Sequence, residues 1–229
     1  MKGRMQKISK DTSQMADRTE TDNKFGGQTY FGITENNFTN NEQKFGMLEM
    51  ILSPMNLNKA YKKVKSNKGS GGVDGLSVDD LLPYLLEHKE SIVNAIIQGK
   101  YRPNPVRRVE IPKEPKKTRP LGIPTVVDRV IQQSIAQILS PIYEPLFSDY
   151  SYGFIPKRSA HGALKQCQKY ISEGYKYCVD MDLEKFFDKV SHSKLIEVLS
   201  KTIKDGRVIS LIHKYLNAGV VEKGVFAET

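Results

Sequence analysis

The stretch that decides the fold is YCVDMDLEKFFDKV, residues 177–190. Its first half alternates apolar residues with Asp180 and Asp182, which is the period of a β-strand and places both carboxylates on one strand face. We predict a strand over residues 175–183 with these acids near its end. Two such carboxylates suit Mg²⁺, which is commonly held by one or two protein carboxylates together with substrate phosphates. The plainer alternative is a pair of solvated aspartates that cap the following turn.

Basic side chains outnumber acidic ones over the 229 residues, 35 Lys and Arg against 26 Asp and Glu, for a net charge of +9. Nucleic acid is therefore the leading partner class, although ribosomal and membrane-surface proteins share this balance. No apolar run is long enough for a membrane span or a signal-peptide core, so we expect a cytoplasmic protein with no membrane partner. Two cysteines, Cys167 and Cys178, are too few for a disulfide framework, and we expect them in the core.

The first part of the chain divides into a polar leader and a folded region. Residues 1–44 lack helical or strand periodicity and are expected to be disordered. Residues 45–125 begin with helical apolar spacing, which gives way to a glycine-rich loop over residues 67–75. Two further helical signals follow, one opening at Ser77 and one running through Ile92 to Gly99. An alternating stretch around a Pro-Lys turn then predicts a two-stranded ribbon with a basic tip.

Residues 126–229 form the third predicted unit. A helix is expected over residues 128–139, because its apolar residues fall on one face, and a second helix over residues 160–171 follows a loop. After the predicted strand, Ser191 is a good N-cap for the first of two helices that end near Gly219.

The run VDMDLEKFFDKVSH, residues 179–192, resembles the first palm motif of group II intron-encoded reverse transcriptases. The fingers motifs of that family resemble YRPNPVRRVEIPK, residues 101–113, and TRPLGIPTVVDRVIQQSIAQIL, residues 118–139. The next family block resembles SYGFIPKRSAHGAL, residues 151–164. The resemblance covers nearly all of the predicted folded region. It implies an α+β right-hand fold, truncated, with fingers over residues 45–125 and the first half of the palm over residues 126–229.

In the palm motif, the resemblance makes Asp182 the catalytic, metal-binding aspartate. Leu183 would lend its backbone carbonyl to the metal, and Phe187 would screen the 2′ position of the nucleotide sugar. Asp188 is the trailing acid of the motif. Asp180 takes no catalytic role in this comparison and is expected to be a structural acid.

In the fingers, the resemblance implies that Lys113 and Arg119 contact the triphosphate of the incoming nucleotide. A lysine is a movable point charge, and the arginine fork can hold two phosphate oxygens, so the chemistry agrees. Without the resemblance, both would be read as solvated cations of a hairpin.

Other cations are candidate template or primer contacts. Four are proposed to neutralise phosphates, in the ribbon and in the loop before the second palm helix: Arg107, Arg108, Lys157 and Arg158. Tyr152 and Phe154 are candidates for stacking on bases, although such residues more often pack onto the core. Ile155 departs from the family, which typically has arginine there.

The implied function is that of an RNA-directed DNA polymerase of the group II intron type, acting in intron mobility and RNA splicing. Its partners would be intron RNA as template, a DNA primer and deoxynucleoside triphosphates. The two-metal Mg²⁺ site is expected to be incomplete, because no Tyr-Ala-Asp-Asp stretch occurs before Thr229, so this piece is expected to be inactive alone. Completion of the site by another chain, as in a dimer, is left open. The alternative is a non-catalytic, maturase-like RNA-binding module.

Overall fold

The computed structural model describes residues 46–114 and 117–227, so the predicted disordered leader over residues 1–44 lies outside the described part of the chain. Short helices α1 (Met47–Leu52) and α2 (Pro54–Ser66) open the fold. Ser53 caps α2 by accepting a hydrogen bond from the Asn56 backbone N–H, and Pro54 stands at the first helical position, where no N–H partner is needed.

Helix α3 (Leu81–Ile97) corrects one expectation, because the two helical signals predicted between Ser77 and Gly99 form a single helix. Ser77 precedes this helix, in a turn where its hydroxyl bonds the Asp80 carboxylate. Pro83 lies in the first turn, whose N–H groups have no partner inside the helix, and so it does not interrupt the helix.

A single core joins α1, α2 and α3 with α4 (Val126–Tyr143) and α8 (Gly206–Leu216). Its fully buried side chains include Leu48, Tyr61, Leu81, Val126 and Val208. The core therefore contains residues from both sides of the predicted boundary at residue 125, and that boundary stays a prediction. Among the described residues, no helix has the length and apolar character needed to cross a bilayer.

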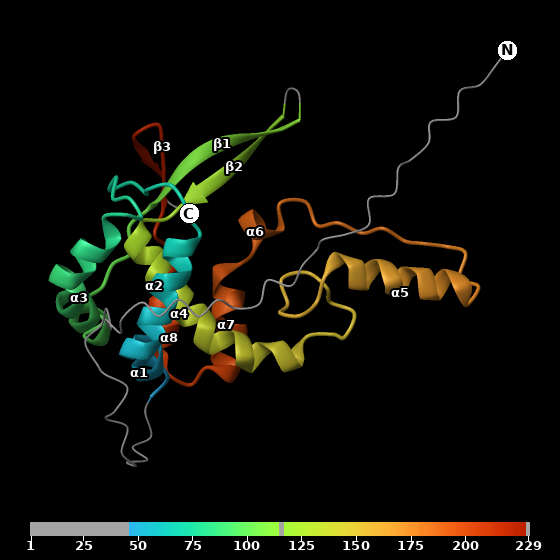
Figure 1. Cartoon of the computed structure of the whole chain (residues 1–229), viewed down its shortest axis with the longest axis horizontal. Coiled ribbons are helices and arrows are strands. Elements are labelled where there is room, and N and C mark those ends of the chain that lie inside the picture. Colours follow the sequence, from blue (N-terminus) through green and yellow to red (C-terminus); the bar gives the residue numbers. More distant parts are fainter. Residues whose placement is uncertain (1–45, 115–116, 228–229) are drawn as a thin grey trace, which may run out of the picture.

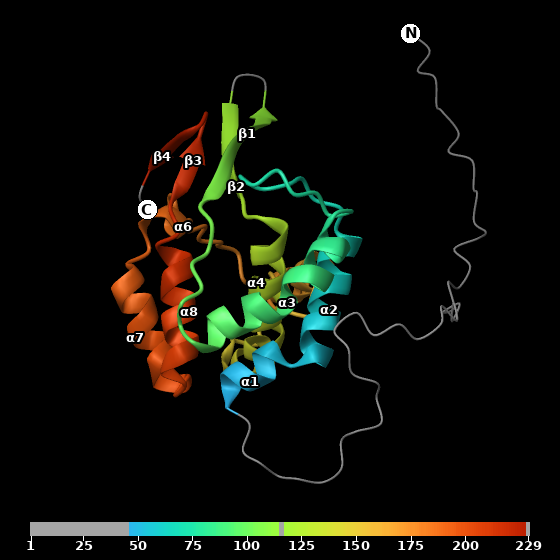
Figure 2. The same ribbon diagram turned by 90° about the vertical axis from the view of Figure 1, so that its left-hand side faces the viewer.

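The predicted two-stranded ribbon is confirmed as β1 (Val106–Glu114) paired antiparallel with β2 (Lys117–Ile123). Two short strands that were not predicted, β3 (Val220–Glu222) and β4 (Val225–Ala227), extend it to a four-stranded sheet of order β2-β1-β3-β4. Strand β3 lies parallel to β1 but pairs only with its first two residues. Beyond that point the ribbon projects from the body (Figures 1 and 2).

Helix α4 continues through the short 3₁₀ helix η1 (Glu144–Leu146) into a loop and then α5 (Ala160–Ser172), which projects from the helical body (Figure 1). A single turn, α6 (Phe186–Lys189), precedes α7 (His192–Thr202). The predicted cap at Ser191 is confirmed, since its hydroxyl accepts from the Lys194 N–H. Helices α7 and α8 are the two helices expected after it.

The strand predicted over residues 175–183 is absent, and these residues form an irregular, exposed connection between α5 and α6. Tyr177 is 96% and Met181 is 86% exposed. A strand is stable only beside other strands that satisfy its backbone groups, and all four strands in the described residues pair with one another instead. The expectation that Cys167 and Cys178 lie in the core is also wrong, since both are exposed.

Candidate functional site

The ribbon places Arg119 on an exposed face. Arg119 lies directly opposite Ile111, and Leu121 lies opposite Val109, so all four side chains share one side of the ribbon. Lys113 falls at an irregularity in the register between Pro112 and Glu114, which is the kind of bulge that re-aims a side chain. Both predicted triphosphate-binding cations are therefore exposed near the projecting end of the ribbon.

Arg107 lies on the same ribbon face, at its base, and contacts the glycine-rich loop. Its Nη2 donates to the Gly71 carbonyl at 2.9 Å. From α4, Arg129 donates to the Ser70 carbonyl, and its desolvation lowers the pKa of this guanidinium. A Cβ on Gly72 would meet the Thr125 backbone at 2.6 Å, so the loop packs tightly against the chain that leaves β2. Arg107 thus supports the loop as well as being a candidate phosphate contact.

Arg108 alternates to the opposite face of the ribbon, on the side of Glu110. The two predicted nucleic-acid contacts in β1 therefore face different ways, and they cannot bind one phosphate together.

The palm-like motif lies in the exposed connection that ends at α6. The Asp182 carboxylate accepts a hydrogen bond from the Leu183 backbone N–H at 2.9 Å. Lys185 takes a left-handed conformation, with φ of 52°, immediately before α6, and Phe187 is 85% exposed. Asp180 and Asp188 are exposed as well. In the residues that the structure covers, no three His, Cys, Asp or Glu side chains gather closely enough to hold a metal ion.

The loop between η1 and α5 is fastened by Arg158. Its Nη1 donates to the Ser148 carbonyl at 2.6 Å and to the Ser151 carbonyl at 2.8 Å. Its Nη2 lies 3.5 Å from Asp149. Arg158, a predicted phosphate contact, therefore donates its hydrogen bonds to the loop itself. Lys157 is exposed, and its backbone is in a left-handed conformation.

Two aromatic residues in the same loop differ in their surroundings. Tyr152 is half-buried, and its ring packs closely against Gly162 at the start of α5. Phe154 is fully exposed, with φ of 59°. Of the two candidates for base stacking, Phe154 is the one whose ring is accessible.

Two features were missed at the sequence level. Asp128 is buried in α4 and binds three separate segments, as described below; its position three residues after the cap Thr125 was the available signal. The second is a groove beside α2, a helix that carries several lysines and no acidic residue. The groove is lined by Lys59, Lys62, Lys63, Ser66, Gln133 and Gln137.

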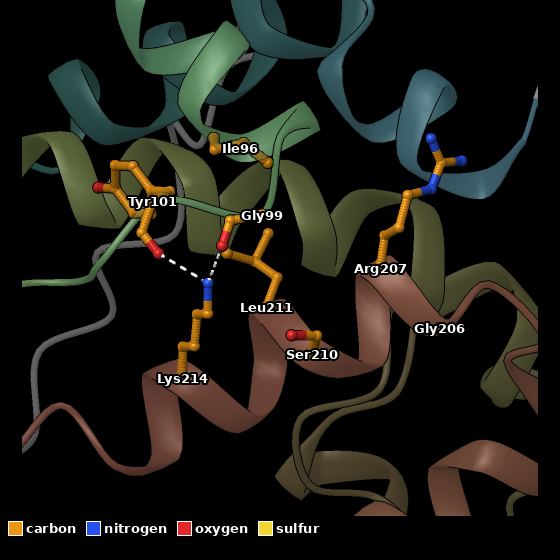
Figure 3. Close-up of a pocket in the computed structure, with 8 residues that line it drawn as sticks. All are labelled: Ile96, Gly99, Tyr101, Gly206, Arg207, Ser210, Leu211 and Lys214. Atoms are coloured by element: carbon orange, nitrogen blue, oxygen red, sulfur yellow. Dashed lines mark hydrogen bonds between the residues drawn. The ribbon is translucent and has the colours of Figure 1, made fainter.

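A cavity of about 210 Å³ lies where α8 passes the end of α3 (Figure 3). It is lined by Ile96 and Tyr101 on one side and by α8, including Leu211, on the other. Lys214 points across it to the carbonyls of Gly99 and Tyr101, the latter at 3.2 Å. Arg207 at its other end is occupied by Glu49 and Asp205, at 2.6 and 2.9 Å. Its cations are thus engaged by protein groups.

Comparison with known proteins identifies the family. Residues 111–228 match the family model described as reverse transcriptase (RNA-dependent DNA polymerase). The chain is 38% identical over 199 residues to the group II intron-encoded protein LtrA of Lactococcus lactis subsp. cremoris, covering 86% of this chain and 33% of that protein. It is 34% identical over 186 residues to protein YkfC of Escherichia coli K12, covering 79% of this chain and 49% of that protein.

A solved structure supports the fold alone. The chain of a partial Cas6-RT-Cas1–Cas2 complex superposes with a TM-score of 0.53 at 20% identity, covering 80% of this chain and 30% of that one. The chain spans about a third of the length of LtrA. The mixture of helices with a four-stranded sheet fits the fingers and partial palm that the sequence predicted. Because the family model matches just over half of its residues, this chain belongs to the reverse transcriptase (RNA-dependent DNA polymerase) family.

Proposed function

We propose that the chain supplies the nucleotide-gripping part of an RNA-directed DNA polymerase that acts in intron mobility and RNA splicing. The observation that carries this proposal is the exposed ribbon face with Arg119, next to the bulge that holds Lys113. A guanidinium can bind two phosphate oxygens at once and never loses its charge, and a lysine beside it adds a mobile charge. A triphosphate is the ligand that such a pair fits.

Reverse transcriptases generally use Mg²⁺, and we propose Asp182 and the Leu183 carbonyl as ligands. The donor set fits only in part: one exposed carboxylate suits an ion that keeps waters and binds substrate phosphates, but no three-ligand group exists in the described residues. When bound, Mg²⁺ would neutralise charge on the reacting phosphates. Phe187, in α6 and five residues after Asp182, is proposed to limit the space at the sugar 2′ position. Lys113 and Arg119 would orient the triphosphate toward a primer hydroxyl.

Nucleotide binding tests the proposal directly. Titration of the chain with a deoxynucleoside triphosphate should show binding that weakens at least about tenfold in Arg119→Ala, because charge-assisted hydrogen bonds are lost. Arg119→Lys keeps the charge but lacks the two-pronged guanidinium, so its affinity should lie between those of the wild type and Arg119→Ala. Arg108→Ala on the opposite ribbon face is the matched control and should bind like wild type. Equal affinity in Arg119→Ala and Arg108→Ala would refute the triphosphate role.

Primer extension on an RNA template, by a form of the protein that also carries the Tyr-Ala-Asp-Asp carboxylates, tests the chemistry. Asp182→Ala should reduce extension by orders of magnitude, since one metal ligand is removed. Asp180→Ala, two residues away, should retain it. Synthesis at the wild-type rate by Asp182→Ala would contradict the catalytic assignment.

The groove beside α2 favours a second candidate function, that of a non-catalytic RNA-binding module. Its three lysines, with no acid on the same helix, would attract a phosphate backbone. Filter binding separates the two candidates. Salt-sensitive RNA affinity that is unchanged in Asp182→Ala, together with no primer extension by a form of the protein that carries the Tyr-Ala-Asp-Asp carboxylates, favours the RNA-binding module.

A further inference from the structure

The carboxylate of Asp128 is the centre of a buried polar junction. The residue is only 1% exposed. One oxygen accepts from the Tyr101 hydroxyl at 2.7 Å and the Tyr215 hydroxyl at 3.1 Å. The other accepts from the Thr125 hydroxyl at 2.7 Å and the Asn104 backbone N–H at 3.1 Å. The carboxylate is thus provided with the several donors that a buried charge requires.

The donors come from the three chain segments that adjoin the sheet. Tyr101 and Asn104 lie in the connection that enters β1 at Val106. Thr125 follows the end of β2 and caps α4. Tyr215 lies in α8, shortly before β3 begins at Val220. One side chain therefore joins the entry to β1, the exit from β2 and the helix that leads to β3.

Helix α8 holds the entry to β1 at a second point. Lys214 donates to the carbonyl of Tyr101, whose hydroxyl binds Asp128, so the tyrosine is fixed at both ends (Figure 3). Burial and then the nearby Asp128 carboxylate raise the pKa of Tyr101. Burial likewise raises the pKa of Tyr215, with Tyr101 and Asp128 adding to it. Both phenols therefore remain hydrogen-bond donors over the ordinary pH range.

The ribbon depends on its base for its direction. Strand β3 supports only Val106 and Arg107 of β1. Ile111, which pairs with Arg119, lies four residues past Arg107, roughly 13 Å at the rise of an extended strand. A tilt of about 5° at the base therefore moves Arg119 by about 1 Å. A misplacement of about 1 Å can lower the rate of a catalysed reaction about 100-fold.

We propose that Asp128 is a positioning residue, which fixes the direction of the ribbon and thereby the place of Arg119 and Lys113. The functional part of this inference rests on the proposed triphosphate site, and the geometric part does not. Asp128 acts through Tyr101 and Tyr215, and it touches no substrate itself.

Hydrogen exchange of the backbone amides tests the geometric part on the whole chain. Tyr101→Phe and Tyr215→Phe each remove one hydroxyl from the carboxylate and keep the ring. Tyr143→Phe is the matched control, because the buried Tyr143 hydroxyl has no hydrogen-bond partner within the described residues. Amides of residues 106–123 should exchange about tenfold faster in the first two variants than in the control, with those of α2 unchanged.

Two outcomes would overturn the inference: ribbon exchange equal to that of Tyr143→Phe, or acceleration of the same size in α2, which would indicate general destabilisation alone. Asp128→Asn, which keeps the side-chain shape, should give the same ribbon-confined pattern as the tyrosine variants. Triphosphate titration then tests the functional part of the inference separately from the geometric part. Weaker binding in Tyr215→Phe but not in Tyr143→Phe supports positioning of the site. Absence of binding by the wild type refutes the triphosphate site, while ribbon exchange still decides the geometric part.

Discussion

Replacing Gly72 with alanine should loosen the contact between the glycine-rich loop and the base of the ribbon. The added Cβ would lie 2.6 Å from the Thr125 Cα, 2.7 Å from its N and 3.0 Å from the Pro124 C, all backbone atoms that cannot rotate away. Ordinary contact begins at 3.4 Å, so the loop must retreat by about 0.8 Å. Overpacking of this kind costs about 2 kcal/mol, which lowers the urea midpoint of unfolding by about 1 M.

The same displacement lengthens the hydrogen bond between Arg107 and the Gly71 carbonyl. Urea unfolding followed by circular dichroism measures the loss, with Gly153→Ala as the control, because a Cβ there meets nothing within 4 Å. The control should unfold within about 0.5 kcal/mol of wild type. If Gly72→Ala matched the control, the tight packing of the loop against Thr125 would be wrong.

Three further outcomes are expected. Asn56→Ala should destabilise the fold by about 2 kcal/mol in urea unfolding, because its buried amide donates to two carbonyls, at 2.8 and 3.0 Å, that would lose this donor. Thr125→Val should cost about 1 kcal/mol or more by the same assay, since the N-cap of α4 is lost. Hydrogen bonds from Arg207 lower the pKa of Glu49 and of Asp205, so their stabilisation is present above the unfolded carboxyl pKa and is lost as the pH falls through the lowered folded values. The urea midpoint should therefore fall on acidification, and it should fall less in Arg207→Ala.

The elements that the sequence predicted correctly are those with local causes. Alternation around the Pro-Lys turn indicated the ribbon, and Ser191 marked the start of α7. The elements it missed depend on partners far along the chain. Strands β3 and β4 have three residues each and exist because Val220 and Val221 pair with β1. For the same reason, alternation over residues 175–183 could not ensure a strand where no described strand lies beside it.

Prediction of the site had the same limit. The roles of Asp182 and Arg119 came from family resemblance, and they stay predictions. No sequence pattern could show that Arg107 and Arg158 donate to backbone carbonyls of their own chain. Every residue has such a carbonyl, so the residue type does not mark the acceptor. A capping pattern from Thr125 to Asp128 is present in the sequence but was not used, and the tyrosines that meet Asp128 lie in two distant segments.

The parallel pairing of Val106 with Val220 sets an order of events during synthesis. The ribosome releases β1 and β2 long before it releases β3. The edge of β1 that later pairs with β3 therefore has no strand partner while α4 to α8 are being synthesised. An open edge invites pairing with a neighbouring chain, and charged side chains discourage it. Arg107 and Arg108 lie in the strand with that open edge, on opposite faces of the ribbon. Their charges are thus suited to discourage intermolecular pairing of the newly made ribbon until β3 pairs with β1.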